Sequence, residues 1–320
     1  MILQQLVQNP RTATAVVLAV VFSVSLAGEL HAQKRVAPVP EITKTTLWDV
    51  AFSSTRNGIA VGDYGVIQRT ADGGRTWTPQ KSTDQFAFRN VHFFSPAEAI
   101  AAGFWASIFR SSDSGRTWTK SNVSIRHHLP GLAAAGWGCV WLSGEKGVIL
   151  KSTDRGATWS EQTSGTGLML DAISFADSLH GWCSSVQGLL LATTDGGAHW
   201  TKRQPPSAMP ITTVLSRTPR ECWIAGYNGL IAQTTDAGAS WSVKQVYNAT
   251  IQRLRFDRNG VGWAACNRGI VLRSNSDLSG WNLFTRAETE ALNSLHFPDD
   301  STLVTVGSAG TILRLSKQLH

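Results

Sequence analysis

The chain has 320 residues, including 13 Trp and 29 Gly, and only 16% of its residues are charged. These proportions are typical of a protein rich in β-strands and tight turns. The formal net charge of +7 favours an acidic partner or an anionic surface. No basic cluster alternates with aromatic residues along one strand, so we do not expect nucleic-acid binding.

The first 32 residues differ in character from the rest of the chain. An apolar run from Thr12 to Ala27 follows Arg11, and Leu30-His31-Ala32 resembles a signal-peptidase site. The run is too short to span a membrane comfortably, so residues 1–32 are interpreted as a cleaved secretory signal peptide. Residues 33–320 would then form one exported domain, periplasmic or extracellular, with no integral membrane span. An uncleaved N-terminal anchor is the alternative.

The chain then passes through four short segments with the alternation of apolar and polar residues that is typical of strands. Glycines and a tight turn, Asp63-Tyr64-Gly65, separate them. The four strands of this first unit are expected at Leu47–Phe52, Gly58–Gly62, Val66–Thr70 and Thr76–Pro79.

A motif of the form Asp-x-Gly-x-Thr-Trp lies between the third and fourth strands and recurs along the chain. Its Asp occupies positions 72, 113, 154, 195, 236 and, in a degraded copy, 277, so each step is 41 residues. A fixed period of about 40 residues is the signature of a repeat architecture. The Asp and Trp residues of the five clear copies are Asp72 and Trp77, Asp113 and Trp118, Asp154 and Trp159, Asp195 and Trp200, and Asp236 and Trp241.

The motif, called an Asp box below, is interpreted as structural. The Asp carboxylate is suited to accept hydrogen bonds from backbone N–H groups in the turn, the Gly permits a positive φ, and the Trp has a large apolar face to bury. The alternative is a row of carboxylates that binds a ligand or a metal. Six copies at equal spacing in a ring of repeats would point to six separate places, however, and would not converge on one site. We therefore expect no metal and no cofactor.

The four cysteines give no sign of a metal site, because no CxxC or Cys/His ligand spacing is present. An even number in an oxidising compartment leaves disulfides open. Buried free thiols are the other interpretation. Each Cys lies in a different repeat, and strands of neighbouring repeats rarely approach closely enough for a disulfide. The residues are Cys139, Cys183, Cys222 and Cys266.

Seven units contain the first three strands, but only six carry a box, because the last unit stops soon after Thr311–Leu315. Residues from about Val36 to Thr46 precede the first unit and have no partner within it. They can supply the missing strand and so remove open sheet edges. The sequence therefore predicts an all-β fold, a seven-bladed β-propeller of four-stranded repeats whose last blade is closed by the N-terminal strand. The third unit is the least regular, because Leu129-Pro130-Gly131-Leu132 makes a poor first strand.

These repeats resemble the photosystem II stability/assembly factor family, propellers built from BNR-type Asp-box repeats. The consensus has three parts: Leu-x-Asp/Ala-Ile-x-Phe, then Gly-Trp-x-x-Gly, then Gly-x-Ile-x-x-Thr-x-Asp-Gly-Gly-x-Thr-Trp. It reads clearly at 47–77 and 170–200 and covers roughly residues 36–316. The resemblance implies an exported, non-enzymatic scaffold, expected to be a monomer, that binds a protein client, a segment of a membrane protein. In a phototroph the client would be a reaction-centre subunit and the location the thylakoid lumen.

Two sets of residues are candidates for partner binding. The first set lies in the turns between second and third strands, where exposed aromatic and basic side chains are typical interface anchors; Trp105 in particular stands where a small turn residue is expected. The alternative is that turns simply contain turn residues. This set is Tyr64, Trp105, Lys146, Tyr227 and Arg268.

The second set is a basic residue that recurs at one place in the third strand. Such a row would suit an acidic client segment, since Arg recognises carboxylates well; the alternative is a solvated charge beside the Asp boxes. The basic row could continue inward, toward the central channel of the propeller. Arg89, Arg253 and Arg255 on first strands would extend the row in that direction. The row is Arg69, Arg110, Lys151, Arg273 and Arg314.

Asp boxes also occur in sialidases and other glycosidases, so a carbohydrate-active enzyme or a glycan-binding propeller is the alternative class. Sialidases use a Tyr nucleophile, and none of the three Tyr residues lies in such a setting. The best pair for a two-carboxylate mechanism is Asp63 with Glu145, and nothing else marks them. The sequence therefore predicts no enzymatic activity.

Overall fold

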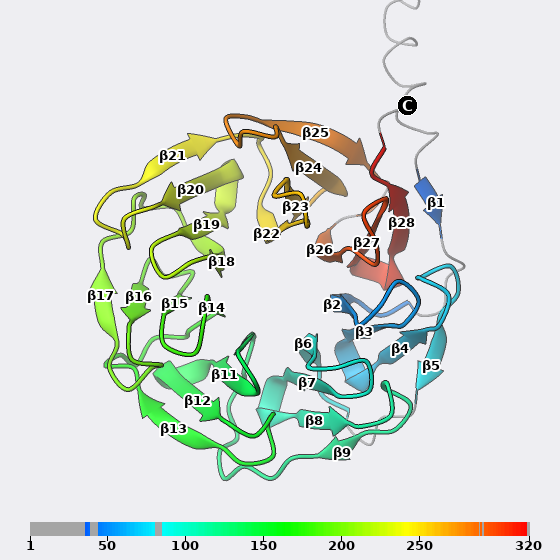
Figure 1. The fold of residues 1–320 in the computed structure, drawn as a ribbon, viewed down its shortest axis with the longest axis horizontal. Helices are drawn as coiled ribbons and strands as arrows, with labels where there is room; N and C mark the ends of the chain where they lie inside the picture. The colour runs from blue at the N-terminus through cyan, green and yellow to red at the C-terminus, as the bar shows by residue number, and fades with distance from the viewer. Residues whose placement is uncertain (1–35, 39–43, 81–84, 288, 290, 319–320) are drawn as a thin grey trace, which may run out of the picture. The chain divides into compact units, whose positions relative to one another are not determined.

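The computed structural model describes residues 36–38, 44–80, 85–287, 289 and 291–318. The predicted signal segment, residues 1–32, lies outside these described residues. The described strands form seven four-stranded antiparallel sheets arranged as blades around a central channel (Figure 1). The prediction of a seven-bladed β-propeller is confirmed.

Each blade is numbered in chain order, and its strands are called A to D from the channel outward. Blade I contains β2 (Leu47–Phe52), β3 (Gly58–Gly62), β4 (Ile67–Thr70) and β5 (Thr78–Gln80). Blade II contains β6 (Phe88–Phe93), β7 (Ala99–Gly103), β8 (Ile108–Ser111) and β9 (Thr119–Lys120). Blade III contains β10 (Gly131–Ala135), β11 (Cys139–Ser143), β12 (Val148–Ser152) and β13 (Ser160–Thr163).

The remaining blades continue the series. Blade IV contains β14 (Ala172–Phe175), β15 (Gly181–Ser184), β16 (Leu190–Thr193) and β17 (Thr201–Arg203). Blade V contains β18 (Ile211–Ser216), β19 (Cys222–Gly226), β20 (Leu230–Thr234) and β21 (Ser242–Gln245). Blade VI contains β22 (Ile251–Phe256), β23 (Gly262–Cys266), β24 (Ile270–Ser274) and β25 (Trp281–Arg286).

Blade VII is composite. Its first three strands are β26 (Leu292–His296), β27 (Thr302–Gly307) and β28 (Ile312–Ser316), and its outermost strand is β1 (Val36–Pro38). Figure 1 shows the blue β1 beside the red β28. Closure of the last blade by an N-terminal strand is thus confirmed, and the pairing covers the outer edge of β28.

The core lies between blades, because strands A to C are buried and strands D are largely exposed. All five residues of β3 are buried, whereas β5 has two exposed residues in three. Trp77 of the first box packs with Phe52 of its own blade and with Val304 of blade VII. Each box Trp is therefore positioned to join two blades through apolar contact.

The Asp box is a closed hydrogen-bond network. Asp72 Oδ1 accepts the backbone N–H groups of Arg75 at 2.9 Å and Thr76 at 3.0 Å, and Oδ2 accepts the Thr76 hydroxyl at 2.6 Å. Thr70 Oγ1 accepts the Gly74 N–H at 2.9 Å. Matching bonds to the carboxylate occur at Asp113, Asp154, Asp195 and Asp236.

Some strand boundaries differ from the sequence-based expectation, and β4 begins at Ile67 rather than Val66. Strand D of blade I begins at Thr78 rather than Thr76, because Trp77 closes the turn and donates from Nε1 to the Gly74 carbonyl at 3.3 Å. Strand A of blade III begins at Gly131 because Pro130 has no N–H to donate. All four cysteines are free thiols.

Among the described residues, no helix has the length and apolarity needed to cross a membrane.

Candidate functional site

The inner strands run between two ends of the channel. The front mouth is defined here as the end where each strand A begins, together with the B–C turns. The rear mouth is the end where each strand A finishes, together with the A–B turns and the Asp boxes. A cavity of about 80 Å³ at the front mouth is lined by residues near the start of all seven inner strands.

A β-bulge near the start of strand A aims side chains into this cavity. In β6, Phe88 pairs with Gly103 and Asn90 with Ala102, so Arg89 is the extra residue. A bulge leaves one residue unpaired and changes the direction of side chains around it, and both Arg89 and Asn90 line the cavity. The same shift occurs in blades I, V, VI and VII.

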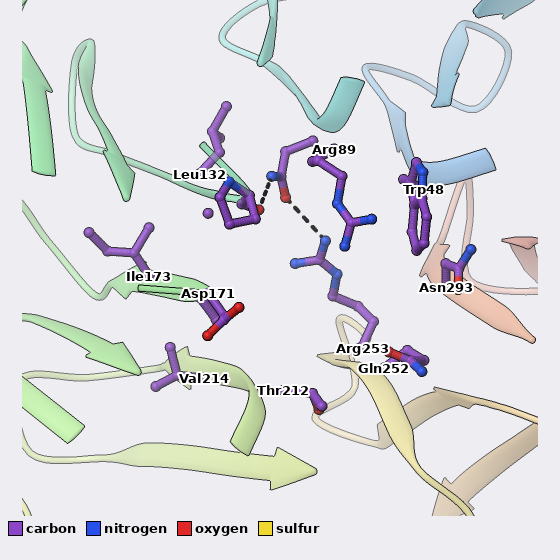
Figure 2. A pocket seen from close by; sticks show the side chains of 14 residues that line it. Trp48, Arg89, Leu132, Asp171, Ile173, Thr212, Val214, Gln252, Arg253 and Asn293 are labelled. Atoms are coloured by element: carbon purple, nitrogen blue, oxygen red, sulfur yellow. Dashed lines mark hydrogen bonds between the residues drawn. The ribbon is translucent and has the colours of Figure 1, made fainter. Parts of the chain in front are cut away.

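Two guanidinium groups from distant blades converge in the front mouth. Figure 2 shows the Arg89 and Arg253 side chains pointing toward each other, with Trp48 beside Arg89. The Arg89 Cζ lies 3.6 Å from the centroid of the Trp48 ring and 5.5 Å from that of Phe104, a cation–π arrangement. Arg253 Nη2 donates to Asn90 Oδ1 at 3.1 Å.

Arg89 is a buried cation whose neighbouring carboxylates act on it from beyond ion-pair distance. Burial and the neighbouring Arg253 charge lower the pKa of Arg89 to about 10, against the opposing attraction of the Asp63, Asp171 and Asp49 carboxylates, so the group stays charged at neutral pH. Among the described residues, no carboxylate lies within ion-pair distance of Arg89. Asp171 lines the same cavity and accepts the Val186 N–H at 2.8 Å, and burial raises its pKa.

A buried carboxylate, Asp49, lies between Arg253 and Arg255. Its Oδ1 is 3.8 Å from Arg253 Nη2 and 3.7 Å from Arg255 Nη2, so two guanidinium groups share one carboxylate. Asp49 also accepts the Ser294 hydroxyl at 2.5 Å and the Val91 N–H at 3.0 Å. The arrangement leaves the channel lining with an excess of positive charge that can attract an anion.

The B–C turns form the rim of the front mouth, and their middle residues take a left-handed backbone conformation. Tyr64, Trp105, Lys146 and Arg268 have φ between 55 and 57°. Tyr227 directly precedes the left-handed Asn228. The side chains project outward: Tyr64 is 74% exposed, Trp105 50% and Tyr227 45%. The five candidates of the first set therefore lie on one rim.

Trp105 belongs to an aromatic cluster on this rim. Its ring centroid lies 6.1 Å from that of Phe86 and 5.1 Å from that of His128. The centroid of the His128 ring lies 4.2 Å from that of Phe104. The backbone N–H of His128 donates to Glu145 Oε2 at 2.9 Å. The cluster fixes a half-exposed Trp next to the cationic pocket.

The basic row on strands C lies elsewhere, at the boundaries between blades. Arg69 Nε donates to the Ser114 carbonyl at 3.0 Å, Lys151 Nζ to the Gly196 carbonyl at 3.0 Å, and Arg314 Nε to the Gly73 carbonyl at 3.2 Å. In each case the acceptor is the second residue of the next blade's box. The structure does not bring this row together with Arg89 and Arg253, and client contact by the row stays a prediction.

The other two members of the row differ. Arg273 lies over the Trp263 ring, with its Cζ 5.3 Å from the centroid, and Arg110 lines a cavity with Glu98 and Arg155.

Blade V has Gln233 at this position, and its link to the next blade comes from Lys244 on β21. The Lys244 Nζ donates to the carbonyls of Leu278 at 2.8 Å and Ser279 at 2.7 Å, within the degraded box. Sequence analysis missed this residue. The absence of a basic residue at Gln233 was the available signal.

The two carboxylates that a glycosidase mechanism would use are both engaged in local contacts. Asp63 Oδ1 accepts the Trp48 Nε1–H at 2.6 Å, and Glu145 accepts the His128 N–H. Within the part of the chain that the structure describes, no group of His, Cys, Asp and Glu is arranged to hold a metal ion.

Comparisons with known proteins place this geometry in a family. The family described as Photosynthesis system II assembly factor YCF48 matches residues 32–167 and 162–250. A comparison with curated protein sequences gives no match.

Similar folds occur among solved structures. The structure described as YCF48 bound to D1 peptide has a TM-score of 0.74 and 18% identity over 88% of this chain and 94% of that one. YCF48 from Cyanidioschyzon merolae has a TM-score of 0.72 and 21% identity over 88% of this chain and 98% of that one. The GH74 xyloglucanase from Xanthomonas campestris has a TM-score of 0.73 and 15% identity over 88% of this chain but only 54% of that one. At these identities the structural similarity establishes the fold.

The family match covers more than half of the chain, and the resemblance inferred from the repeats is confirmed: the chain belongs to the Photosynthesis system II assembly factor YCF48 family.

Proposed function

We propose that this protein is an exported, non-enzymatic assembly scaffold that binds a segment of a membrane-protein client across the front mouth. The observation that carries the proposal is the convergence of Arg89 and Arg253 in one cavity, where Arg89 forms no ion pair with a carboxylate among the described residues. A client carboxylate between the two groups would relieve their mutual repulsion and form charge-assisted hydrogen bonds.

The rim supplies the rest of the contact. Trp105, Tyr64 and Tyr227 expose large amphipathic side chains around the cationic pocket. Aromatic residues of this kind contribute most of the binding energy at many protein interfaces. An extended segment lying over the pocket would thus place an acidic group on the arginines and apolar side chains on the rim.

The family gives the first client to test. A relative was solved with a D1 peptide, so a D1 segment, or the corresponding subunit in the source organism, is our proposed client. If the source is a phototroph, the proposed location is the thylakoid lumen; otherwise it is the periplasm or the extracellular space. Mass spectrometry of the protein isolated from its native host would test cleavage after residue 32.

The binding test uses the full chain and peptides tiled across the D1 sequence, with affinity measured by fluorescence anisotropy. One peptide should bind, and Arg89→Gln with Arg253→Gln should weaken it by about tenfold or more, since each lost charge-assisted bond is costly. The matched control is Arg203→Gln, which changes the net charge at an exposed strand D position. Equal affinity in all variants would remove the client site from the front mouth. A further variant, Trp105→Ala, tests the rim. Loss of peptide affinity in that variant alone would place the client site on the rim.

A further inference from the structure

The rear mouth of the channel holds a larger cavity than the front mouth. Its volume is about 360 Å³, and it is lined by the ends of the inner strands and the A–B turns of blades V, VI, VII and I. A volume of this order matches sites for small organic ligands, which run from about 300 Å³ upward. The proposal for the front mouth makes no use of it.

Part of the wall of this rear cavity is apolar and aromatic. Phe52, Phe256 and Phe297 line it from three different blades, Leu215 and Pro298 add to this apolar part, and the other lining residues are polar or charged. Aromatic faces bury a large area of an apolar ligand.

A cationic side chain caps this apolar part of the wall. The Arg217 Cζ lies 4.3 Å from the Phe256 ring centroid, and Arg217 Nη1 is paired with Glu221 Oε1 at 3.0 Å. Arg217 is thereby held in place, with its charge already partly balanced.

The inner end of the cavity is cationic. Arg255 reaches it from β22, and its only close carboxylate among the described residues is Asp49, which Arg253 shares. The Arg255 Nε atom and the His296 Nδ1 atom are both buried without a hydrogen-bond partner in the described part of the chain. Burial and the Arg255 charge lower the pKa of His296 to about 3, so its ring is neutral and Arg255 is the cation of this pair.

Three acidic residues line the cavity, Asp257, Asp299 and Asp300, and among the described residues none of them forms an ion pair with Arg255. Asp257 Oδ2 lies 2.7 Å from Lys317 Nζ and accepts the Trp263 Nε1–H at 3.0 Å. Asp299 Oδ1 accepts the N–H and hydroxyl of Ser301 at 2.8 and 2.7 Å. The cavity therefore combines a partly apolar wall with an inner cation whose charge is only partly balanced.

We propose that the rear mouth is a second binding site, for a carboxylate carried on an aromatic or aliphatic body. The carboxylate would bind Arg255, and the apolar body would lie against Phe52, Phe256 and Phe297. Both a free carboxylic acid and the C-terminal residue of a peptide have this chemistry. The site lies at the opposite end of the inner strands from Arg89, so Arg89 takes no part in it.

The test compares N-acetyl-phenylalanine with its amide and with acetate on the full-length protein labelled with 13C at histidine. The acid should shift the ring signals of His296 and leave those of His127 and His128 at the front rim unchanged. We expect a dissociation constant of about 1 mM or below for a ligand of this size. The amide, which lacks the charge, and acetate, which lacks the apolar body, should each bind at least about tenfold more weakly. Equal shifts with acid and amide, or no shift at His296, would overturn the proposal.

Variants then fix the location. Arg255→Gln should abolish the His296 response, while Arg89→Gln should leave it unchanged and separate this site from the client site. If Arg255→Gln does not fold, the comparison of acid with amide on the unaltered chain still decides. A tripeptide ending in Phe, compared with its C-terminal amide, distinguishes the two sources: binding of the tripeptide acid supports a C-terminal residue, and binding of N-acetyl-phenylalanine alone supports a small acid.

Discussion

Arg69 on β4 donates a hydrogen bond from Nε to the carbonyl of Ser114, the second residue of the Asp box in the neighbouring blade. Lys151 and Arg314 repeat this contact at two other blade boundaries. A basic residue that recurs every 41 residues thus ties a blade to the turn of the next one. Recurrence alone does not indicate a binding surface.

The first prediction concerns this tie. Arg69→Met should lower the free energy of unfolding by about 1–2 kcal/mol, because a charged donor to a part-buried carbonyl is lost. Urea unfolding measures the change, and Arg203→Met on an exposed outer strand is the control, expected within about 0.5 kcal/mol of the parent. Loss of client affinity with unchanged stability would instead support the basic row as a client surface.

The second prediction concerns the Asp box. Asp154→Ala should destabilise the fold by about 1–2 kcal/mol at neutral pH, because the N–H and hydroxyl of Thr158 lose their acceptor in a turn that is still accessible to water. Client affinity should not change, since the box lies at the rear of the propeller. If the free energy of client binding fell by more than the free energy of unfolding, the structural interpretation of the boxes would be contradicted.

The third prediction is the pH dependence of the same boxes. Burial acts to raise the pKa of Asp72, Asp113 and Asp154, but hydrogen bonds from Thr hydroxyls and backbone N–H groups outweigh it and lower the pKa to about 2. Their folded pKa lies below the unfolded value of about 4. Their stabilisation is therefore complete above about pH 4 and is lost as the pH falls through about 2.

Urea unfolding at a series of pH values measures this effect. The unfolding free energy should fall from about pH 4 toward pH 2, and Asp154→Ala should show a shallower fall than the parent. Parallel curves for parent and variant would exclude a contribution from this carboxylate.

The fourth prediction uses two glycines in equivalent turns. A Cβ on Gly229, at φ 72°, would lie 2.0 Å from the Tyr247 carbonyl oxygen, whereas one on Gly188, at φ 85°, would meet nothing within 4 Å. Gly188→Ala should therefore cost only backbone strain, about 1 kcal/mol. Gly229→Ala should cost at least about 3 kcal/mol, because the clash adds to that strain. Thermal and urea unfolding of both variants test this, and equal losses would refute the close approach.

The sequence was sufficient for the architecture because the 41-residue spacing of Asp72 and its later copies repeats one supersecondary unit. It also predicted closure by an N-terminal strand from the missing fourth strand after Leu315. It placed Arg89 and Arg253 near the channel but could not bring them together. Strict alternation aims only every second side chain at one face, and the β-bulge that aims Arg89 and Asn90 at the same cavity is not encoded in that alternation.

The contacts between blades were also beyond the sequence pattern. Arg69 and Ser114 are 45 residues apart, and their contact depends on how two finished sheets pack. Periodicity identifies each blade but not the angle between neighbours, so the basic row remained open to both interpretations.

The last prediction concerns the boundary between blades VI and VII. Blade VII has no Asp box, and a buried ion pair stands at its boundary with blade VI instead: Lys317 Nζ lies 2.7 Å from Asp257 Oδ2, and the two side chains are 7% and 4% exposed. Removing one partner of a buried pair leaves a desolvated charge, which typically costs about 3–5 kcal/mol.

Lys317→Met should fall near the lower end of that range, because Asp257 keeps the N–H groups of Asn259, Val261 and Trp263 Nε1. Asp257→Asn should be at least as costly, because it leaves the buried Lys317 charge unpaired and its one amide oxygen cannot accept from all three donors. A double-mutant cycle by urea unfolding separates the pair from its surroundings. A coupling near zero would mean that β1 pairing and apolar packing alone hold the last blade, whereas a large coupling would make this pair the functional replacement for the missing seventh box.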